Sequence, residues 1–186
     1  MNLNPGTYQL TAQSGKLYIY TFKEGMLSAV AHDLLIDATQ FTINVNIPST
    51  SSEPAGSEAE IKADSLKVIC AMKDGQRQPN TLKQKDLADI EETMFKDVLH
   101  PAKYPVITFR STNIMQEKEG TYRVKGELTL HGVTRPVEFN ANTTTGKDLK
   151  GKVTIAQKDF GIKPYKALLG TLKVKNEVDI AFDLSF

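Results

Sequence analysis

Residues 122–139, YRVKGELTLHGVTRPVEF, constrain the fold of this chain more than any other stretch. Up to Leu130, every second residue is apolar or glycine, and the residues between them are polar. This period of two is that of a strand with one buried and one solvent-exposed face. The pattern breaks at Gly132, which can adopt a positive φ, and resumes with Val137, Phe139 and Ala141 on one parity. The sequence therefore predicts two antiparallel strands joined by a short loop over residues 131–135.

The same alternation recurs at short spacing along the chain. Residues 41–47 and 174–186 alternate clearly, and residues 29–36 place His32, Leu34 and Ile36 on one face. Residues 17–22 also alternate, but both of their faces are apolar or aromatic. Many strands with turn signals and no β-α-β rhythm predict an all-β fold with one main helix. We expect an antiparallel β-barrel of about eight strands, because closure removes exposed edges, and an open sandwich is the alternative. The length predicts a single domain over residues 1–186.

A stripe of apolar residues at helical spacing predicts the one main helix, and it consists of Leu87, Ile90, Met94, Phe95 and Val98. The helix should end before Pro101, and Thr81 and Asp86 are equally good candidates to cap its start. In a barrel, this stripe would plug or flank an opening. Residues 48–58 and 73–80 have the composition of loops. One further helical turn is expected near residues 165–168, after an irregular crossing at 159–164.

Charge and composition limit the classes of partner. The chain has 23 Lys and Arg residues against 22 Asp and Glu residues, and it lacks a basic run that could follow a phosphate backbone, so nucleic acid is not an expected partner. No window is apolar enough for a membrane span, and the opening residues do not resemble a signal peptide. We expect a cytoplasmic protein, or a periplasmic one if a signal peptide has been removed. Cys70 is single and fits a buried strand position. No Cys or His pair has metal-ligand spacing, so neither a metal nor a cofactor is expected.

Several stretches resemble the YceI-like family. Residues 128–137, LTLHGVTRPV, resemble its signature hairpin, and residues 100–109, HPAKYPVITF, resemble its tyrosine-proline segment. Residues 159–162 and 173–178 resemble its closing strands. The resemblance covers roughly the C-terminal half, whereas in the N-terminal half Gln40 stands where many members have glycine. It implies a lipocalin-like barrel that binds a polyisoprenoid or another long-chain lipid, and it suggests a homodimer.

On this reading, apolar side chains facing the barrel interior are the candidate ligand contacts. The candidates are Phe22, His32, Leu34, Met94, Phe95, Phe109, Leu128, Phe139, Ala141, Ile180 and Phe182. His32 is the one polar residue among them, and it could line the mouth of the barrel. His131 and Arg135 could meet an anionic lipid head group if they face the barrel opening, because Arg binds phosphate in a fork. A structural role in the turn is the alternative for both.

Catalytic motifs are absent from the sequence. There is no Gly-x-Ser-x-Gly elbow and no phosphate-binding glycine loop. His32 and Asp33 form the one suggestive pair, but neighbouring residues on a strand point to opposite faces. We therefore expect a binding protein and no enzyme. The alternatives are a hydrolase that uses His32, and an interaction or stress-response module with a solid core.

Overall fold

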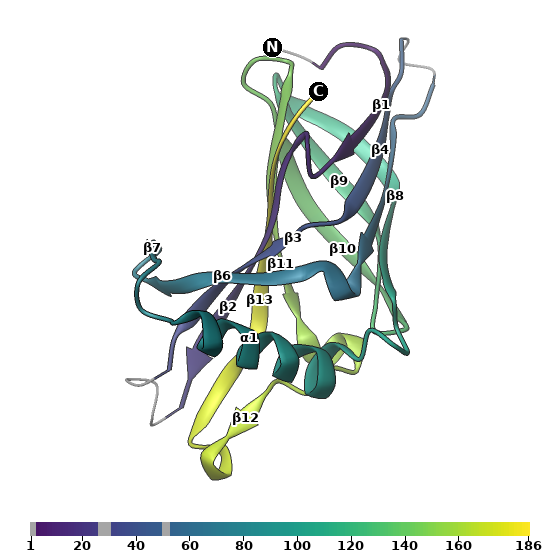
Figure 1. Ribbon diagram of the computed structural model, residues 1–186. Coiled ribbons are helices and arrows are strands. Elements are labelled where there is room, and N and C mark those ends of the chain that lie inside the picture. The colour runs from purple at the N-terminus through teal and green to yellow at the C-terminus, as the bar shows by residue number, and fades with distance from the viewer. Residues whose placement is uncertain (1–2, 26–30, 50–52) are drawn as a thin grey trace.

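The computed structural model of the chain describes residues 3–25, 31–49 and 53–186 (Figure 1). Its thirteen strands all belong to one antiparallel sheet. In chain order they are β1 (Gly6–Thr11), β2 (Gly15–Glu24), β3 (Asp33–Ala38), β4 (Phe41–Ile47), β5 (Gly56–Lys62), β6 (Leu66–Lys73), β7 (Gln76–Gln78), β8 (Val106–Lys118), β9 (Thr121–Leu130), β10 (Val133–Asn142), β11 (Asp148–Ala156), β12 (Lys166–Ala167) and β13 (Leu172–Ser185). The helical segments are η1 (Ala63–Ser65), α1 (Gln84–Thr93), η2 (Met94–Leu99), η3 (Gln157–Phe160) and η4 (Leu168–Gly170).

The sheet curls strongly because three of its strands bend and continue. Its order is β1-β4-β5-β8-β9-β10-β11-β13-β2-β3-β6-β7. Only short breaks separate β1 from β2, β3 from β4, and β5 from β6. Across the second and third breaks, Thr39 N–H donates to Ser65 O at 3.1 Å and Lys62 N–H donates to Gln40 O at 3.0 Å. The ladder therefore continues round the corner, and the segment formed by β1 and β2 pairs with β4 and β3 on one side and, through β2, with β13 on the other.

Counting each bent pair as one strand, and leaving out the short β7 and β12, gives eight long strands. The predicted antiparallel β-barrel is thus confirmed, and the open sandwich is not observed. Closure is incomplete along one seam, where β1 pairs with β4 and, within the described residues, with no second strand. The Tyr8 and Phe186 rings meet there with centroids 4.6 Å apart.

The central hairpin forms where the alternation predicted it, with a tighter turn than expected. β9 and β10 pair from Val133 opposite Leu130 to Asn142 opposite Thr121. The loop is reduced to His131 and Gly132, which both have positive φ values, 53° and 75°. Two such residues form the turn that matches the twist of the flanking strands. β10 consequently begins at Val133 and not beyond residue 135.

The predicted helix is present and ends before Pro101, as expected, but its N-cap differs from the expectation. Neither Thr81 nor Asp86 is the N-cap residue, which is Lys83. Asp86 lies in the first turn instead, where its carboxylate accepts a 2.8 Å hydrogen bond from Lys83 N–H. From Met94 the helix widens into the π-helical η2, which ends at His100 with a left-handed backbone.

Two further expectations need correction. Residues 73–80 are not only a loop, since Asp74 and Gly75 form a turn from which β7 returns to pair with β6. The helical turn expected near residues 165–168 lies slightly later in the chain, because β12 occupies Lys166–Ala167 and the 3-10 turn η4 spans Leu168–Gly170. Cys70 is buried on β6, as expected.

Candidate functional site: a cavity inside the barrel

A cavity of about 660 Å³ occupies the barrel interior. Its wall is built almost wholly from aliphatic and aromatic side chains of the long strands, with α1 and η2 covering one end (Figure 1). The inward parity of β9 supplies Val124, Leu128 and Leu130. These are the residues that the period-two pattern placed on the buried face, so the alternation that folds the strand also lines the cavity.

One wall of the cavity carries a row of phenylalanine rings with glycines between them. Phe109 of β8, Phe139 of β10 and Phe182 of β13 all line the cavity. The Phe139 centroid is 5.6 Å from that of Phe109 and 5.9 Å from that of Phe182. Gly126 and Gly151 lie on the intervening strands, and a Cβ at either position would overlap the Phe109 or the Phe182 ring. The glycines therefore let the rings lie close to the sheet.

The opposite wall, formed by β2 to β6, is aliphatic. Leu17 and Ile19 of β2, Ile36 of β3, Val45 of β4 and Ile61 of β5 line it. All but Ile19 are at most 9 % exposed. Among the described lining residues, no aromatic ring comes from these strands.

The structure brings seven of the eleven predicted ligand contacts together in the cavity wall. They are Met94, Phe109, Leu128, Phe139, Ala141, Ile180 and Phe182. Each lies on the inward parity of its strand, apart from Met94, which enters from η2. Met94 and Val98 thus place part of the helical stripe on the cavity wall.

The other four predicted contacts lie outside the wall. Phe22 is on the outer parity of β2, since Leu17, Ile19 and Thr21 are the residues that face inward. Leu34 and Phe95 pack against the core of the β1 to β6 region instead. His32 is exposed. Both faces of β2 are apolar or aromatic, so the sequence pattern alone could not choose between them.

The two head-group candidates also lie away from the cavity wall. Arg135 is exposed, and its guanidinium donates to Thr134 O at 3.2 Å. His131 packs against Tyr104 with ring centroids 4.1 Å apart, and its Nε2 is 3.1 Å from His100 Nδ1. His131 thus joins the β9–β10 turn to the end of η2, which is the structural alternative.

The surroundings of His131 favour its neutral form. Burial has the largest effect, and the nearby His100 and Lys103 also lower the pKa of His131 below its usual value of 6.5, while a hydrogen bond with the Phe160 backbone acts in the opposite direction.

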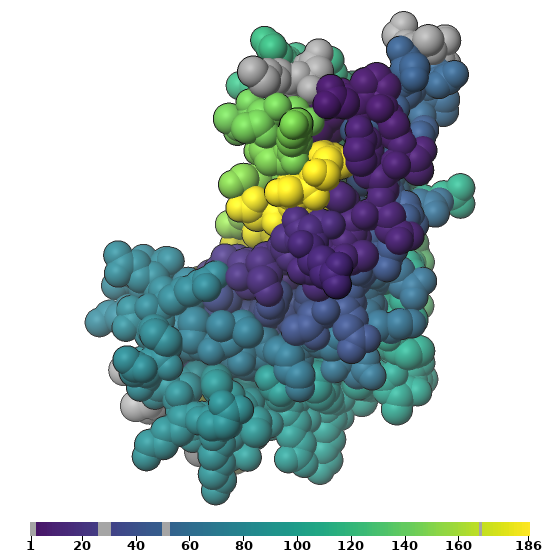
Figure 2. Space-filling view, turned by 45° about the horizontal axis from the view of Figure 1, so that its top comes forward, coloured from purple at the N-terminus to yellow at the C-terminus, as the bar shows by residue number. Residues whose placement is uncertain are grey.

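Most polar side chains of the wall gather at the end of the barrel near the chain termini. They are Asn46, Ser49, Glu53, Ser57, Gln116 and Tyr122. Figure 2 shows this end turned toward the viewer, with the N-terminal, C-terminal and β10–β11 segments crowded around it. Sequence reasoning missed these residues, because several belong to residues 48–57, which show no periodicity. Leu17, Ile19 and Ile36 were also missed, although their inward parity was a usable signal.

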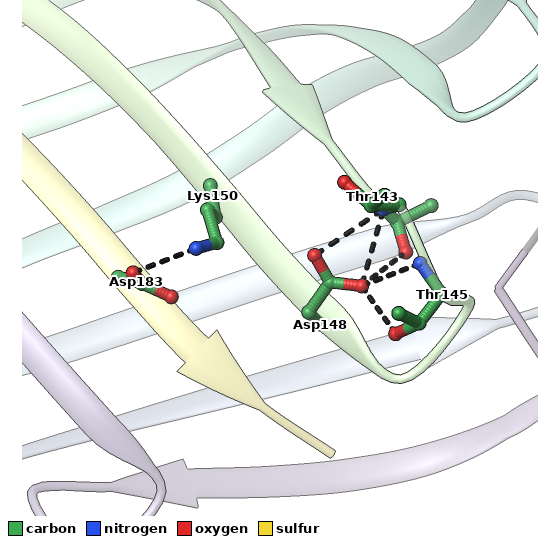
Figure 3. Close-up of polar contacts among 6 residues, drawn as sticks. Thr143, Thr145, Asp148, Lys150 and Asp183 are labelled. Carbon is green, nitrogen blue, oxygen red and sulfur yellow. Dashed lines mark hydrogen bonds and ion pairs between the residues drawn. The ribbon is translucent and has the colours of Figure 1, made fainter.

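The β10–β11 turn at this end is held by one carboxylate (Figure 3). Asp148 accepts hydrogen bonds from Thr145 N–H at 2.7 Å, Thr144 N–H at 3.1 Å and the Thr143 hydroxyl at 3.2 Å. The Thr145 hydroxyl and backbone together have the largest effect in lowering the pKa of Asp148 to about 2. On the outer face beside the turn, Lys150 pairs with Asp183 at 2.9 Å. The turn is therefore a structural part of the rim.

Metal chemistry finds no support in the described part of the chain, where no three His, Cys, Asp or Glu residues are grouped to hold an ion. Among the same residues, no helix has the length and apolar character needed to cross a membrane.

Comparisons with known proteins agree with this architecture. The YceI-like domain model matches residues 8–186. A UPF0312 protein of Pseudomonas savastanoi pv. phaseolicola is 39% identical over 97 residues, which cover 47% of this chain and 48% of that protein. A UPF0312 protein of Vibrio cholerae is 37% identical over 76 residues, covering 36% and 40%. The matched part of the chain thus spans about half the length of these relatives or less.

Two solved structures share the fold at low sequence identity. BcnA of Burkholderia cenocepacia superposes with a TM-score of 0.68 at 18% identity, covering 94% of this chain and 98% of that one. A domain from Saccharophagus degradans, described as polyisoprenoid binding and implicated in plant cell wall breakdown, gives 0.57 at 12% identity, covering 96% and 97%. At these identities the likeness concerns the fold, whereas the match of the domain model extends over nearly the whole sequence. The chain therefore belongs to the YceI-like family.

Proposed function

We propose that residues 1–186 act as a single, non-catalytic domain that holds one long apolar ligand inside the barrel. The observation that supports this most is the cavity itself, whose volume of about 660 Å³ is lined mostly by apolar side chains. That volume falls within the roughly 300–1,000 Å³ typical of small-molecule sites. A polyisoprenoid or a similar long-chain lipid has the required shape, and the Saccharophagus degradans domain is described as binding that class.

The energetics permit useful affinity without a strong head-group site. Burial of apolar chain gains about 0.8 kcal/mol per CH₂, so roughly fifteen buried carbons gain about 12 kcal/mol. Association and ordering cost about 4–15 kcal/mol, which offsets much of this gain. The remainder depends on how well the ligand fits the two walls.

The polar end of the cavity favours an uncharged head group. Hydroxyl and amide groups of Ser57, Asn46 and Tyr122 can donate or accept hydrogen bonds there. Among the described lining residues, Glu53 is the one Asp, Glu, Lys, Arg or His. A phosphate beside this carboxylate would be repelled and would lack the cationic partner that such groups require. We therefore favour a prenyl alcohol or a similar neutral lipid over a prenyl phosphate.

A hydrolase that uses His32 is the alternative function, and the geometry favours it less. His32 is exposed, and the Asp33 carboxylate accepts a 2.8 Å hydrogen bond from Lys23 N–H. The carboxylate is thus engaged by the backbone of β2. A hydrolase screen of wild type and His32→Ala tests this alternative, and turnover lost in the variant would support it.

The homodimer suggested by the resemblance stays a prediction.

The proposed function is tested by extracting the purified protein with organic solvent for mass spectrometry, and by titrating delipidated protein with matched ligands. We expect a long-chain lipid in the extract, and tighter binding of a prenyl alcohol than of the phosphate with the same chain. Glu53→Gln should narrow the difference between the two ligands, because it removes the repulsion. Empty protein that takes up neither ligand would contradict the proposal, and preference for the phosphate would contradict the neutral head group.

A further inference from the structure

A hairpin at the end of the barrel opposite the chain termini combines positive charge with an exposed apolar tip. We call it the basic finger, and it comprises β12, η4 and the first residues of β13, together with Lys163. In Figure 1, β12 extends beyond α1 at this end. Residues 160–176 contain four lysines and no acidic residue, although the whole chain has a net charge of only +1. The positive charge is therefore concentrated here.

The lysines of the basic finger form no ion pair within the described structure. Lys163, Lys166 and Lys175 are exposed, and no ion pair among the described residues involves them or Lys173. Lys166 is the direct register partner of Lys173. Like charges directly opposite each other destabilise a strand pair. On its other side Lys173 lies opposite Glu24 of β2, the one nearby acid on the adjoining strand.

The tip of the basic finger presents a leucine to solvent. Leu169 is 107% exposed, whereas the next most exposed large apolar residue in the described part of the chain, Met115, is 51% exposed. Leu169 also has a left-handed backbone, with φ 56° and ψ 29°. A leucine rarely adopts this conformation, and sparsely populated backbone conformations concentrate at functional sites.

The base of the basic finger reaches the cavity. Ile162, which directly precedes Lys163, and Val178, three residues after Lys175, both line the cavity wall. The finger is therefore the outer continuation of segments that form the ligand site.

We propose that the basic finger docks this protein on the surface of an anionic lipid bilayer. Lysines are attracted by anionic head groups, and an exposed leucine gains by entering the boundary between head groups and acyl chains. A nucleic acid would satisfy the lysines but would offer Leu169 no apolar layer, so the bilayer fits both features. This inference goes beyond the proposed function, since docking needs no ligand in the cavity.

The test is flotation of the whole chain with vesicles of phosphatidylcholine alone or mixed with phosphatidylserine. We expect binding to the mixed vesicles that weakens from about 0.1 M to about 1 M salt, where the screening length falls from about 10 to about 3 Å. Lys166→Gln with Lys173→Gln should weaken binding about fivefold per lysine, from about 1 kcal/mol for each lysine near an anionic surface. Leu169→Asn should weaken it further, and asparagine tolerates the left-handed backbone.

A matched control removes the same charge at the other end of the barrel, with Lys118→Gln and Lys147→Gln, which are both exposed. This control should bind as wild type does. Urea unfolding checks that each variant is folded. The variant with Lys166→Gln and Lys173→Gln should be slightly more stable than wild type, because it no longer has two lysines opposite each other. Absence of wild-type binding, equal binding to neutral vesicles, or an equal loss in the control would overturn the proposal. Ligand uptake is measured separately without vesicles, so failure of docking leaves the proposed function standing.

Discussion

The two walls of the cavity are shaped by different means. On β8 to β13, Gly126 and Gly151 leave room for phenylalanine rings, so the surface follows from close approach of rings to backbone. On β2 to β6, aliphatic side chains cover the wall and the bent strands give the curvature. Rigid rings fix one side of the cavity, whereas aliphatic side chains can repack around different ligands. We therefore expect the aromatic wall to select ligands by their shape and the aliphatic wall to accept ligands of different shapes.

The largest expected effect comes from Gly126→Ala, which challenges this contrast directly. The new Cβ would overlap the Phe109 ring and lie 2.5 Å from Arg110 O. Because the backbone cannot easily yield, we expect a loss of about 1–3 kcal/mol in the free energy of unfolding. Urea denaturation measures it.

The matched control is Gly56→Ala on β5, where nothing lies within 4 Å of the new Cβ. It should be neutral or slightly stabilising, since alanine restricts the unfolded chain. Equal effects of the two substitutions would mean that glycine does not shape the aromatic wall.

A change of pH should have a smaller effect on stability, and this effect should arise at the β9–β10 turn, where the aromatic wall ends. The lowered pKa of His131 means that the unfolded chain binds its proton more readily than the folded chain. Stability should be complete above the unfolded pKa of about 6.5 and should fall as the pH drops toward the folded pKa. His131→Asn keeps the positive φ accessible and should flatten this dependence.

Urea midpoints at about pH 7.5 and about pH 5.5 measure this effect. His32→Asn is the control, because His32 is exposed and lies directly before β3, away from the β9–β10 turn. If the slope between the two pH values were the same in wild type and His131→Asn, protonation of His131 would not influence stability.

Sequence reasoning succeeded where one face of a strand is polar. The β9 alternation predicted the inward positions of Val124 and Leu128, and the β10 parity predicted Phe139 and Ala141. It failed at Phe22, because both faces of β2 are apolar. There Arg77 stacks over the outer Tyr18 ring at 5.1 Å and covers it, a contact that no local pattern reveals.

Other features depend on contacts between distant segments. The corners at Thr39 and Ser65 carry no turn signal, yet their backbone hydrogen bonds close the barrel. The polar end of the cavity draws Glu53 and Ser57 from one aperiodic segment and Tyr122 from β9. Periodicity reports the environment of one strand, so it cannot show which loops meet at a rim.

The hollow interior is the central claim, and Ala141→Leu tests it most directly. Ala141 lines the cavity beside the aromatic wall and is 4% exposed. In a solid core, the added methylenes would cost about 1–3 kcal/mol. In a hollow barrel they project into the cavity, so the delipidated variant should be about as stable as wild type but should bind long prenyl alcohols more weakly.

The measurement combines urea midpoints of delipidated protein with ligand titrations, for wild type, Ala141→Leu and the control Ala181→Leu. Ala181 is on the outer parity of β13 and lies opposite Tyr18 and Lys152, so its substitution should leave ligand binding unchanged. We predict unchanged stability and weakened binding in Ala141→Leu alone. A loss of about 1–3 kcal/mol with unchanged ligand binding, in a variant that a circular dichroism spectrum shows to be folded, would contradict the hollow barrel.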